Sequence, residues 1–306
     1  MIVAVFTRAA IVAALILLFS APASPAVLVG IADQKPRMFG DERFERAGFH
    51  VVRLSISWDA MDHRDQRGNL RRWLAGARRA KVRPLLTFGH ARGDRRRVLP
   101  APERLAAELR GIRKAYPWVR EFATWNEANH CGEPTCHRPE LVARYHVALR
   151  AACPSCTILA AELLDTPNMV RWVRDFTAAL PPGPQPGPVW GLHNYLDANR
   201  MRTTGTQALL AATTGQVWMT ETGGIVRRTN VKRITFPESA SHAAAATRWI
   251  FKKLVPLSPR ITRVYLYHWD AEPGASWDSG LIGEHGEIRP AFRVVRSVLQ
   301  TPRAGT

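Results

Sequence analysis

The chain has 306 residues, of which 46% are hydrophobic and 22% charged, a composition typical of a globular protein. Its formal charge is +18, but the arginines are scattered, and no basic motif interleaved with aromatic residues accompanies them. The charge therefore predicts no nucleic-acid partner and leaves an anionic polymer open as a partner.

Residues 1–26 have the pattern of a secretory signal peptide, in which a basic residue precedes the apolar run 9–19 and small residues follow. This run is shorter than the roughly 20 residues that a membrane span needs, so an uncleaved anchor is the less favoured alternative. We expect cleavage after Ala23 or Ala26. The mature protein, residues 27–306, is then secreted to the extracellular space and has no membrane contact.

The mature chain contains eight short β-rich runs, several of them almost continuously apolar, as expected for parallel strands covered on both faces. The runs are 27–32, 51–57, 82–88, 120–125, 157–163, 189–195, 216–221 and 261–269. Helical patterns follow the runs, at 39–48, 69–81, 102–117, 139–153, 168–180, 206–215, 238–255 and 289–300. Eight βα units in about 280 residues predict the α/β class and one domain, a (β/α)8 TIM barrel.

Two glutamates fall where such a barrel opens, because active sites of this fold lie at the carboxyl ends of the strands. The fourth run leads into WNEAN at 125–129, which contains Glu127, and the seventh leads into TETGG at 220–224, which contains Glu221. Retaining glycosidases need two carboxyl groups about 5–5.5 Å apart, one as acid/base and one as nucleophile. Strand ends facing each other across the barrel mouth provide such a pair.

These motifs resemble those of clan A glycoside hydrolases, in which the acid/base Glu follows an Asn at the end of the fourth strand and the nucleophile ends the seventh. WNEAN is similar to the clan's Asn-Glu-Pro motif, NEAN is similar to the NEPN of family 39, and TETGG resembles the nucleophile site. Ala128 replaces the usual proline, and Thr222 and Gly223 replace the usual aromatic residue and glycine. The resemblance covers the mature chain, but it leaves the choice between a family 39-like and a family 5-like protein open.

The resemblance implies a role for each matching residue. Glu127 would be the acid/base and Glu221 the nucleophile, with Asn126 on the sugar 2-hydroxyl, Arg53 and Tyr195 holding Glu221, His193 completing the His-x-Tyr pattern of the sixth strand, and Trp269 as the aromatic platform beneath the sugar. Because Glu127 must be protonated near neutral pH, we expect burial and the charge of Glu221 to raise its pKa.

Other polar and aromatic residues near strand ends are weaker candidates. His90, at the end of the third run, is a candidate sugar-binding residue, and Trp58 and Trp125 are candidates for stacking on pyranose faces. Asp33, Glu162 and Asp165 also lie near strand ends. For each of these residues, a purely structural role in the core or in a loop is the alternative.

The four cysteines form two close pairs, Cys131 with Cys136 and Cys153 with Cys156. In an exported protein an even number of cysteines favours disulfides. The pairs precede and follow the helix predicted at 140–151, which places them at opposite ends of the barrel. Local pairing is therefore expected, because a disulfide needs a short Cα–Cα distance.

Two histidines flank the first cysteine pair, so a zinc site at His130, Cys131, Cys136 and His137 is an alternative to the first disulfide. Zinc requires thiolates, and export favours the oxidised pair. We therefore expect no metal and no cofactor.

Taken together, the residues predict a monomeric, secreted glycoside hydrolase that cleaves a glycosidic bond, with β favoured, in an oligo- or polysaccharide with net retention. Three alternatives remain. One is a transglycosylase using the same residues, one is a non-catalytic glycan-binding protein, and one is an adhesion barrel that binds an anionic polymer through its basic surface.

Overall fold

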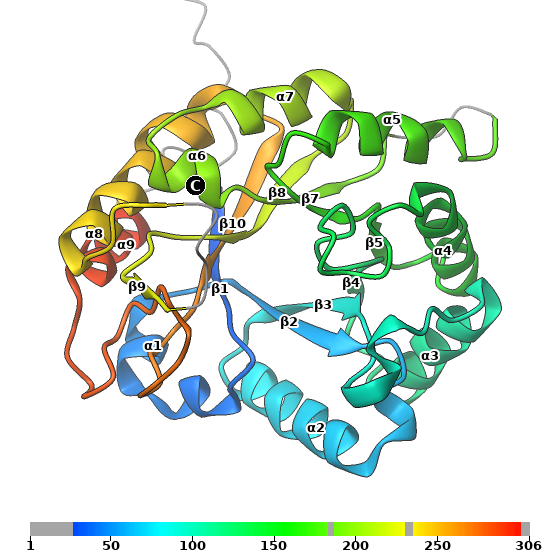
Figure 1. Ribbon diagram of the computed structural model, residues 1–306. Helices are drawn as coiled ribbons and strands as arrows, with labels where there is room; N and C mark the ends of the chain where they lie inside the picture. The colour runs from blue at the N-terminus through cyan, green and yellow to red at the C-terminus, as the bar shows by residue number, and fades with distance from the viewer. Residues whose placement is uncertain (1–26, 183–186, 230–234, 301–306) are drawn as a thin grey trace, which may run out of the picture.

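The computed structural model describes residues 27–182, 187–229 and 235–300, so the predicted signal peptide at 1–26 lies outside the described residues. Nine parallel strands form a barrel at the centre of the molecule, surrounded by helices (Figure 1). The strands are β1 (Leu28–Ala32), β2 (Val51–Ser57), β3 (Arg83–Gly89), β4 (Glu121–Ala123), β5 (Thr157–Leu159), β6 (Glu162–Leu164), β7 (Trp190–His193), β8 (Val217–Thr222) and β10 (Ile261–Tyr267). All eight predicted β runs contain a strand.

The fifth predicted run is interrupted, and the barrel closes at this interruption. Its halves β5 and β6 stand at the two ends of the strand order β5-β4-β3-β2-β1-β10-β8-β7-β6. The backbone N–H of Ala160 donates to the carbonyl of Val189 on one side, at 2.8 Å, and that of Glu162 donates to Trp125 on the other, at 3.0 Å. Hydrogen bonds thus join this segment to the neighbouring segments on both sides, so β5 and β6 together occupy the position of the fifth strand in an eight-stranded barrel. The predicted (β/α)8 fold is confirmed.

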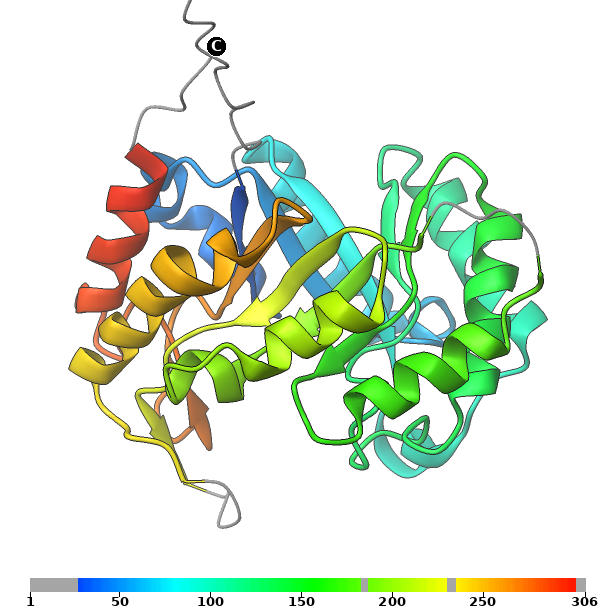
Figure 2. The ribbon, with the colours of Figure 1, turned by 90° about the horizontal axis from the view of Figure 1, so that it is seen from above.

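The helices surround the strands and run back along the outside of the barrel (Figure 2). They are α1 (Glu42–Ala47), α2 (Arg64–Arg79), α3 (Pro102–Ala115), α4 (Pro139–Ala152), α5 (Met169–Ala178), α6 (Tyr195–Asn199), α7 (Thr204–Ala212), α8 (Ala240–Trp249) and α9 (Pro290–Gln300). The helix α2 begins five residues before the predicted pattern, and the short helix α6 was not predicted. Within the described ranges, no helix combines the length and apolar character needed to cross a membrane.

The side chains of each strand alternate between two hydrophobic cores, as the two-residue period of a strand requires. The inner core fills the barrel with Ala32, Val51, Leu85, Ala123, Leu159, Trp218 and Tyr265. The outer core lies between the barrel and the helices and includes the apolar face of α2, with Leu70, Trp73 and Leu74. Because all nine strands are parallel, their carboxyl ends lie at one rim, which we call the mouth.

A two-stranded ribbon formed by the loops after β8 and β10 also lies at the mouth. It consists of β9 (Arg227–Arg228) and β11 (Trp277–Asp278), which pair in antiparallel fashion. The ring of Trp277 packs edge-on against that of Tyr195, with 4.9 Å between their centroids. This ribbon therefore adjoins one of the predicted site residues.

Candidate active site

Glu127 and Glu221 lie close together at the mouth. A carboxylate oxygen of each, together with a ring nitrogen of His193, lie within 4.8 Å of one another. Both glutamate side chains are partly exposed, with 22% and 14% of their surface accessible. This spacing is near the one that retaining glycosidases use, and it is shorter than the spacing of inverting enzymes, which need room for a water molecule.

The backbone of Glu127 has an unusual conformation, with φ at +44°, a region that residues with a side chain rarely adopt. Three hydrogen bonds hold the surrounding turn. Asn126 N–H donates to the carbonyl of Phe88, Ala128 N–H to that of Glu162, and His130 N–H to that of Glu127. Such conformations persist where neighbouring structure fixes them, often at functional sites.

Arg53 is fully buried and joins the two halves of the site. Its Nη1 donates to Glu221 at 2.8 Å and its Nη2 to the amide oxygen of Asn126 at 2.7 Å, while its Nε donates to Glu162 at 2.8 Å. A second, shorter contact links Nη2 to Glu162. The predicted neighbours Arg53, Asn126 and Glu221 are thus brought together around one guanidinium.

Glu162 is fully buried and is the principal counter-charge of Arg53. Burial raises the pKa of Glu162, but the charge of Arg53, the contact with His193 and the hydrogen bonds from Arg53 lower it by more, to about 2. Thr87 also donates to Glu162, at 2.9 Å. A Cβ at Gly191 would lie 2.5 Å from Cγ of Glu162, so a glycine on the neighbouring strand leaves room for this side chain.

His193 lies between two carboxylates. Its Nδ1 is 3.1 Å from Glu127, and its Nε2 is 3.5 Å from Glu162. Burial lowers the pKa of His193, but the charge of Glu221, the hydrogen bond to Glu127 and the ion pair with Glu162 outweigh burial and raise it to about 9. His193 therefore carries a proton near neutral pH.

The expectation that the pKa of Glu127 is raised is wrong. Burial does raise this pKa, but the hydrogen bond from His193 and the charges of His193, His130 and Arg53 lower it more. His130 Nδ1 lies 3.5 Å from the second oxygen of Glu127. In the free protein, the proton expected on Glu127 thus resides on its hydrogen-bond partner His193.

Two tyrosines complete the site around Glu221. The hydroxyl of Tyr195 donates to Glu221 at 3.0 Å, as expected. Tyr267 ends β10 on the same face as the inner-core residue Tyr265, and the charges of Glu221 and Glu127 help to raise its pKa, which burial raises most. Tyr267 was not among the predicted site residues, although the alternation along its strand was a usable signal.

Trp269 does not occupy the position expected for a sugar platform. It is 1% exposed and packs edge-on against Phe44, Phe49 and Phe292 in the outer core. Its indole N–H donates to Asp41 at 3.1 Å. Because protein covers the ring of Trp269, the expectation for this residue is corrected, and Tyr267, two residues earlier, lies on the inner side of the same strand.

Trp58 and Trp125 are also buried, so neither offers a face to a sugar. Trp58 donates to the carbonyl of Val98, and Trp125 donates to Glu133. The structure therefore agrees with a role in the core for both tryptophans, and not with stacking on a sugar.

His90 and Asn126 line a polar cavity of about 230 Å³ at the ends of the first four barrel strands. Its other polar lining residues are Gln34, Ser55, Ser57, Gln66, Asn69 and Arg92. The Nδ1 of His90 is 2.8 Å from the buried carboxylate of Glu133, which fixes the orientation of the ring. The cavity adjoins the arginine network through Asn126 and contains no carboxylate, so it suits a ligand rich in hydroxyl groups.

The aspartates Asp33 and Asp165 brace loops at the mouth. Asp33 accepts from the backbone N–H groups of Lys35 and Trp269, each at 2.8 Å, and Asp165 accepts from two N–H groups at the start of α6. Burial raises the pKa of Asp33 to about 6 and that of Asp165 to about 7. The carboxylate oxygens of both aspartates thus accept hydrogen bonds from backbone N–H groups, which agrees with the structural role given as the alternative.

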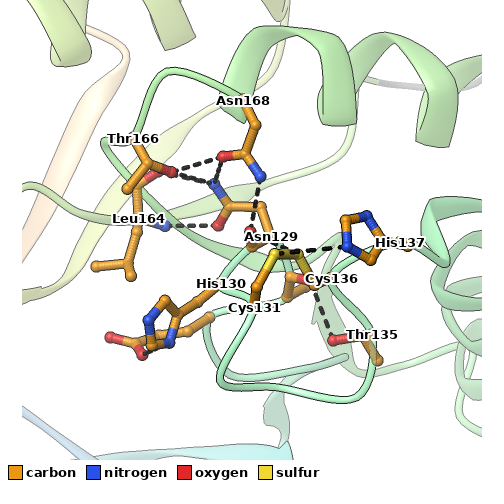
Figure 3. The surroundings of a disulfide bond; sticks show 11 residues. Asn129, His130, Cys131, Thr135, Cys136, His137, Leu164, Thr166 and Asn168 are labelled. Carbon is orange, nitrogen blue, oxygen red and sulfur yellow. Dashed lines mark hydrogen bonds and ion pairs between the residues drawn. A yellow bond between two sulfur atoms is a disulfide. The ribbon is translucent and has the colours of Figure 1, made fainter.

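The loop after Glu127 is closed by a disulfide between Cys131 and Cys136, whose Cα atoms are 4.8 Å apart (Figure 3). Asn129 anchors this loop, because its side chain donates to the carbonyl of Leu164 at 3.0 Å and accepts from the N–H of the same residue at 2.9 Å. Asn168 donates to the carbonyl of Asn129 at 2.9 Å. The disulfide-closed loop is thus tied to the segment after β6.

The second disulfide joins Cys153 and Cys156 at the opposite end of α4, so both pairs are local, as expected. The zinc alternative needs the thiolates of Cys131 and Cys136, and these sulfurs are bonded to each other. His137 lies 3.7 Å from the sulfur of Cys131. This group of residues therefore forms a loop closure.

No protein-family model matches the chain, and no curated protein matches its sequence. Solved structures match it along 90–92% of its length. A family 39 glycoside hydrolase from Bacteroides cellulosilyticus WH2 is 14% identical with a TM-score of 0.58, and the match covers 92% of this chain and 65% of that one. A GH5_18 protein from Bifidobacterium longum subsp. infantis is 16% identical with a TM-score of 0.65, covering 92% and 80%.

A third match is xylanase 10B from Thermotoga maritima, 12% identical with a TM-score of 0.62, covering 90% of this chain and 96% of that one. At these identities the likeness shows the fold. The chain therefore shares the (β/α)8 fold of these glycoside hydrolases.

Proposed function

We propose that this protein is a secreted retaining glycoside hydrolase that cleaves a β-glycosidic bond by double displacement. Glu221 is the nucleophile and Glu127 the acid/base. The observation that carries the proposal is the approach of these carboxylates and His193 to within 4.8 Å at the barrel mouth. The shared fold of glycoside hydrolases supports it.

In the first step, a carboxylate oxygen of Glu221 attacks the anomeric carbon while the bond to the leaving oxygen breaks, and Glu127 gives that oxygen a proton. In the second step, water attacks the anomeric carbon, its proton passes to Glu127, and Glu221 is released as a carboxylate. Arg53 and Tyr195 contact different oxygens of Glu221, which orients the nucleophile and favours its ionised form. Since Asn126 accepts from Arg53, its amide N–H groups are left to bind the 2-hydroxyl of the sugar.

The proton that Glu127 donates comes from its pair with His193. In the free protein this proton lies on His193, whose Nδ1 is 3.1 Å from Glu127. Substrate that excludes water from the mouth favours the neutral pair, because an ion pair loses more solvation than two neutral groups. Transfer along this hydrogen bond then gives neutral His193 and protonated Glu127, the acid form.

The proposal is tested with a panel of aryl β-glycosides and two variants. Glu221→Gln should lower turnover by at least about 10³-fold, and Glu127→Ala by about 10²–10⁴-fold with poor leaving groups. Azide should restore turnover of Glu127→Ala and give a β-glycosyl azide, but it should not rescue Glu221→Gln. The exposed Glu140→Gln, which removes one carboxylate from α4, is the matched control and should retain full activity.

NMR of the first product should show the same anomer as the substrate. Inversion would exclude Glu221 as nucleophile. Glycan binding without turnover in the wild-type protein would instead identify a non-catalytic binding protein, and transfer to an added sugar acceptor would identify a transglycosylase.

A further inference from the structure

The helix α2 carries a row of positive charges on its outer surface. It contains six arginines and one aspartate, and all six arginines are exposed. The opposite face of the helix is buried in the outer core. The arginines therefore form one solvent-facing side of the helix, as the helical period requires.

The first four of these arginines line a groove of about 920 Å³ between α2 and the end of α3. Its lining residues are Arg64, Asp65, Arg67, Gly68, Arg71, Arg72 and Tyr116. Within the described part of the chain, no carboxylate forms an ion pair with Arg64, Arg71 or Arg72. The groove thus combines free cationic side chains with one aromatic ring.

Gly68 is a second, independent feature of this groove. Glycine in the middle of an exposed helix destabilises it by about 1 kcal/mol relative to alanine, so it needs a reason. Packing gives none, because a Cβ at this position would meet only the end of the Arg72 side chain, at 3.6 Å. The glycine leaves bare backbone between the arginines, where a ligand can approach closely.

We propose that this groove binds an acidic polysaccharide at a site separate from the candidate active site. Guanidinium groups pair bidentately with carboxylates, and Tyr116 offers an apolar ring to a sugar. Because α2 follows the loop after β2, its first residue, Arg64, places one end of the groove on the outside of the barrel at the end that carries the mouth. A polymer held there raises the effective concentration of its own bonds at the mouth.

Other polyanions fit less well. The lining contains no aliphatic side chain to insert into an anionic membrane. Its single aromatic ring contrasts with the series of rings on which proteins stack single-stranded nucleic acid. The choice of a polysaccharide over these partners rests on the proposed glycosidase function, whereas the presence of a polyanion site does not.

Retention on immobilised polygalacturonate at physiological salt tests the inference. The mature protein should be retained, and Arg71→Gln/Arg72→Gln should weaken binding about tenfold. The matched control is Arg293→Gln/Arg296→Gln, which removes the same charge from exposed positions of α9 and should weaken binding by less than about twofold. Both double variants should keep the turnover of aryl glycosides, so binding and catalysis are read separately.

Several results would overturn the inference. Absence of retention would remove it, and equal weakening by the two double variants would attribute binding to net charge alone. Tighter binding to polydeoxythymidine than to polygalacturonate at equal ionic strength would make the groove a nucleic-acid site. Retention without any glycosidase activity would leave this inference standing and refute the proposed function.

Discussion

Arg53 shows why a single buried side chain determines so much of the candidate site. Its guanidinium reaches Glu162, Glu221 and Asn126 from one plane. A lysine carries its three donors on one atom and cannot reach three partners that come from three different segments of the chain. The positions of Glu127 and Glu221 are therefore linked through one residue that lies on neither of their strands.

Glu162 stabilises the fold through its contact with Arg53. Glu162→Gln leaves a buried arginine without its main counter-charge, so the free energy of unfolding should fall by about 3–5 kcal/mol. The exposed pair of Arg138 with Glu140 provides the control, because Glu140→Gln should change it by less than about 1 kcal/mol. Chemical denaturation measures both variants. Equally small losses of unfolding free energy would mean that Glu221 alone suffices as the counter-charge of Arg53.

The proton shared by His193 and Glu127 should determine the alkaline limb of the pH profile of kcat/KM. As the pH rises through about 9, His193 loses this proton, the acid form disappears and kcat/KM falls. In His193→Asn, Glu127 must hold the proton alone, so the limb should move at least about one unit lower. A pH profile of kcat/KM measures the shift, and an unchanged limb would exclude His193 as the proton store.

The positions of Glu127, Glu221, Arg53, His193 and Tyr195 at the mouth could be predicted, because each lies in or just after a β run that the sequence reveals. The environment of these residues could not. The partner of Arg53 lies 109 residues away, so no local pattern connects it with Glu162. The sign of the Glu127 pKa shift was missed for the same reason, since it depends on His193, a partner 66 residues away.

At the scale of elements, the disulfide-closed loop after β4 follows directly on Glu127, the proposed acid/base. Its residue Glu133 accepts from both His90 and Trp125, and its first turn contains Glu127. Replacing Cys131 and Cys136 by serine should therefore lower kcat for poor leaving groups by about tenfold, because the acid is less well positioned.

The second disulfide is the control for this loop. Cys153→Ser/Cys156→Ser removes a similar local closure at the far end of α4 and should leave kcat within about twofold of the wild-type value. Steady-state kinetics with good and poor leaving groups separates the two effects. Equal losses in both double variants would reduce the first disulfide to a general stabilising role.

The barrel strands and the long helices were predictable, whereas the short elements at the mouth were not. The runs at 51–57 and 261–269 became strands because their apolar, β-branched pattern is strong over seven or more residues. The helix α6 and the ribbon of β9 and β11 are two to five residues long, and tertiary contacts such as that of Trp277 with Tyr195 hold them. The break in the fifth run depends on its neighbours on both sides, which its own sequence does not encode.

For the whole molecule, the two ends of the described chain are joined through Trp269. Its ring packs on Phe44 of α1 and Phe292 of α9. Trp269→Ala should lower the free energy of unfolding by about 3–5 kcal/mol, because it empties a large part of the outer core. Calorimetry or denaturant unfolding measures this loss.

Tyr267→Ala should affect activity more than stability, the opposite of Trp269→Ala, since the ring of Tyr267 packs on the inner core rather than between helices. We expect kcat/KM to fall by about tenfold or more and stability to change less than in Trp269→Ala. If Trp269→Ala instead impaired substrate affinity in the folded protein, the purely structural role assigned to Trp269 would be wrong.

The two disulfides that flank α4 have a consequence for proteolysis. Pro154 and Ser155 are exposed between Cys153 and Cys156. A cut between them leaves the two fragments covalently joined, so the nicked protein migrates as one chain on a gel until a reductant separates it. The two loops that are closed by disulfides thus tolerate a single cut without release of either fragment.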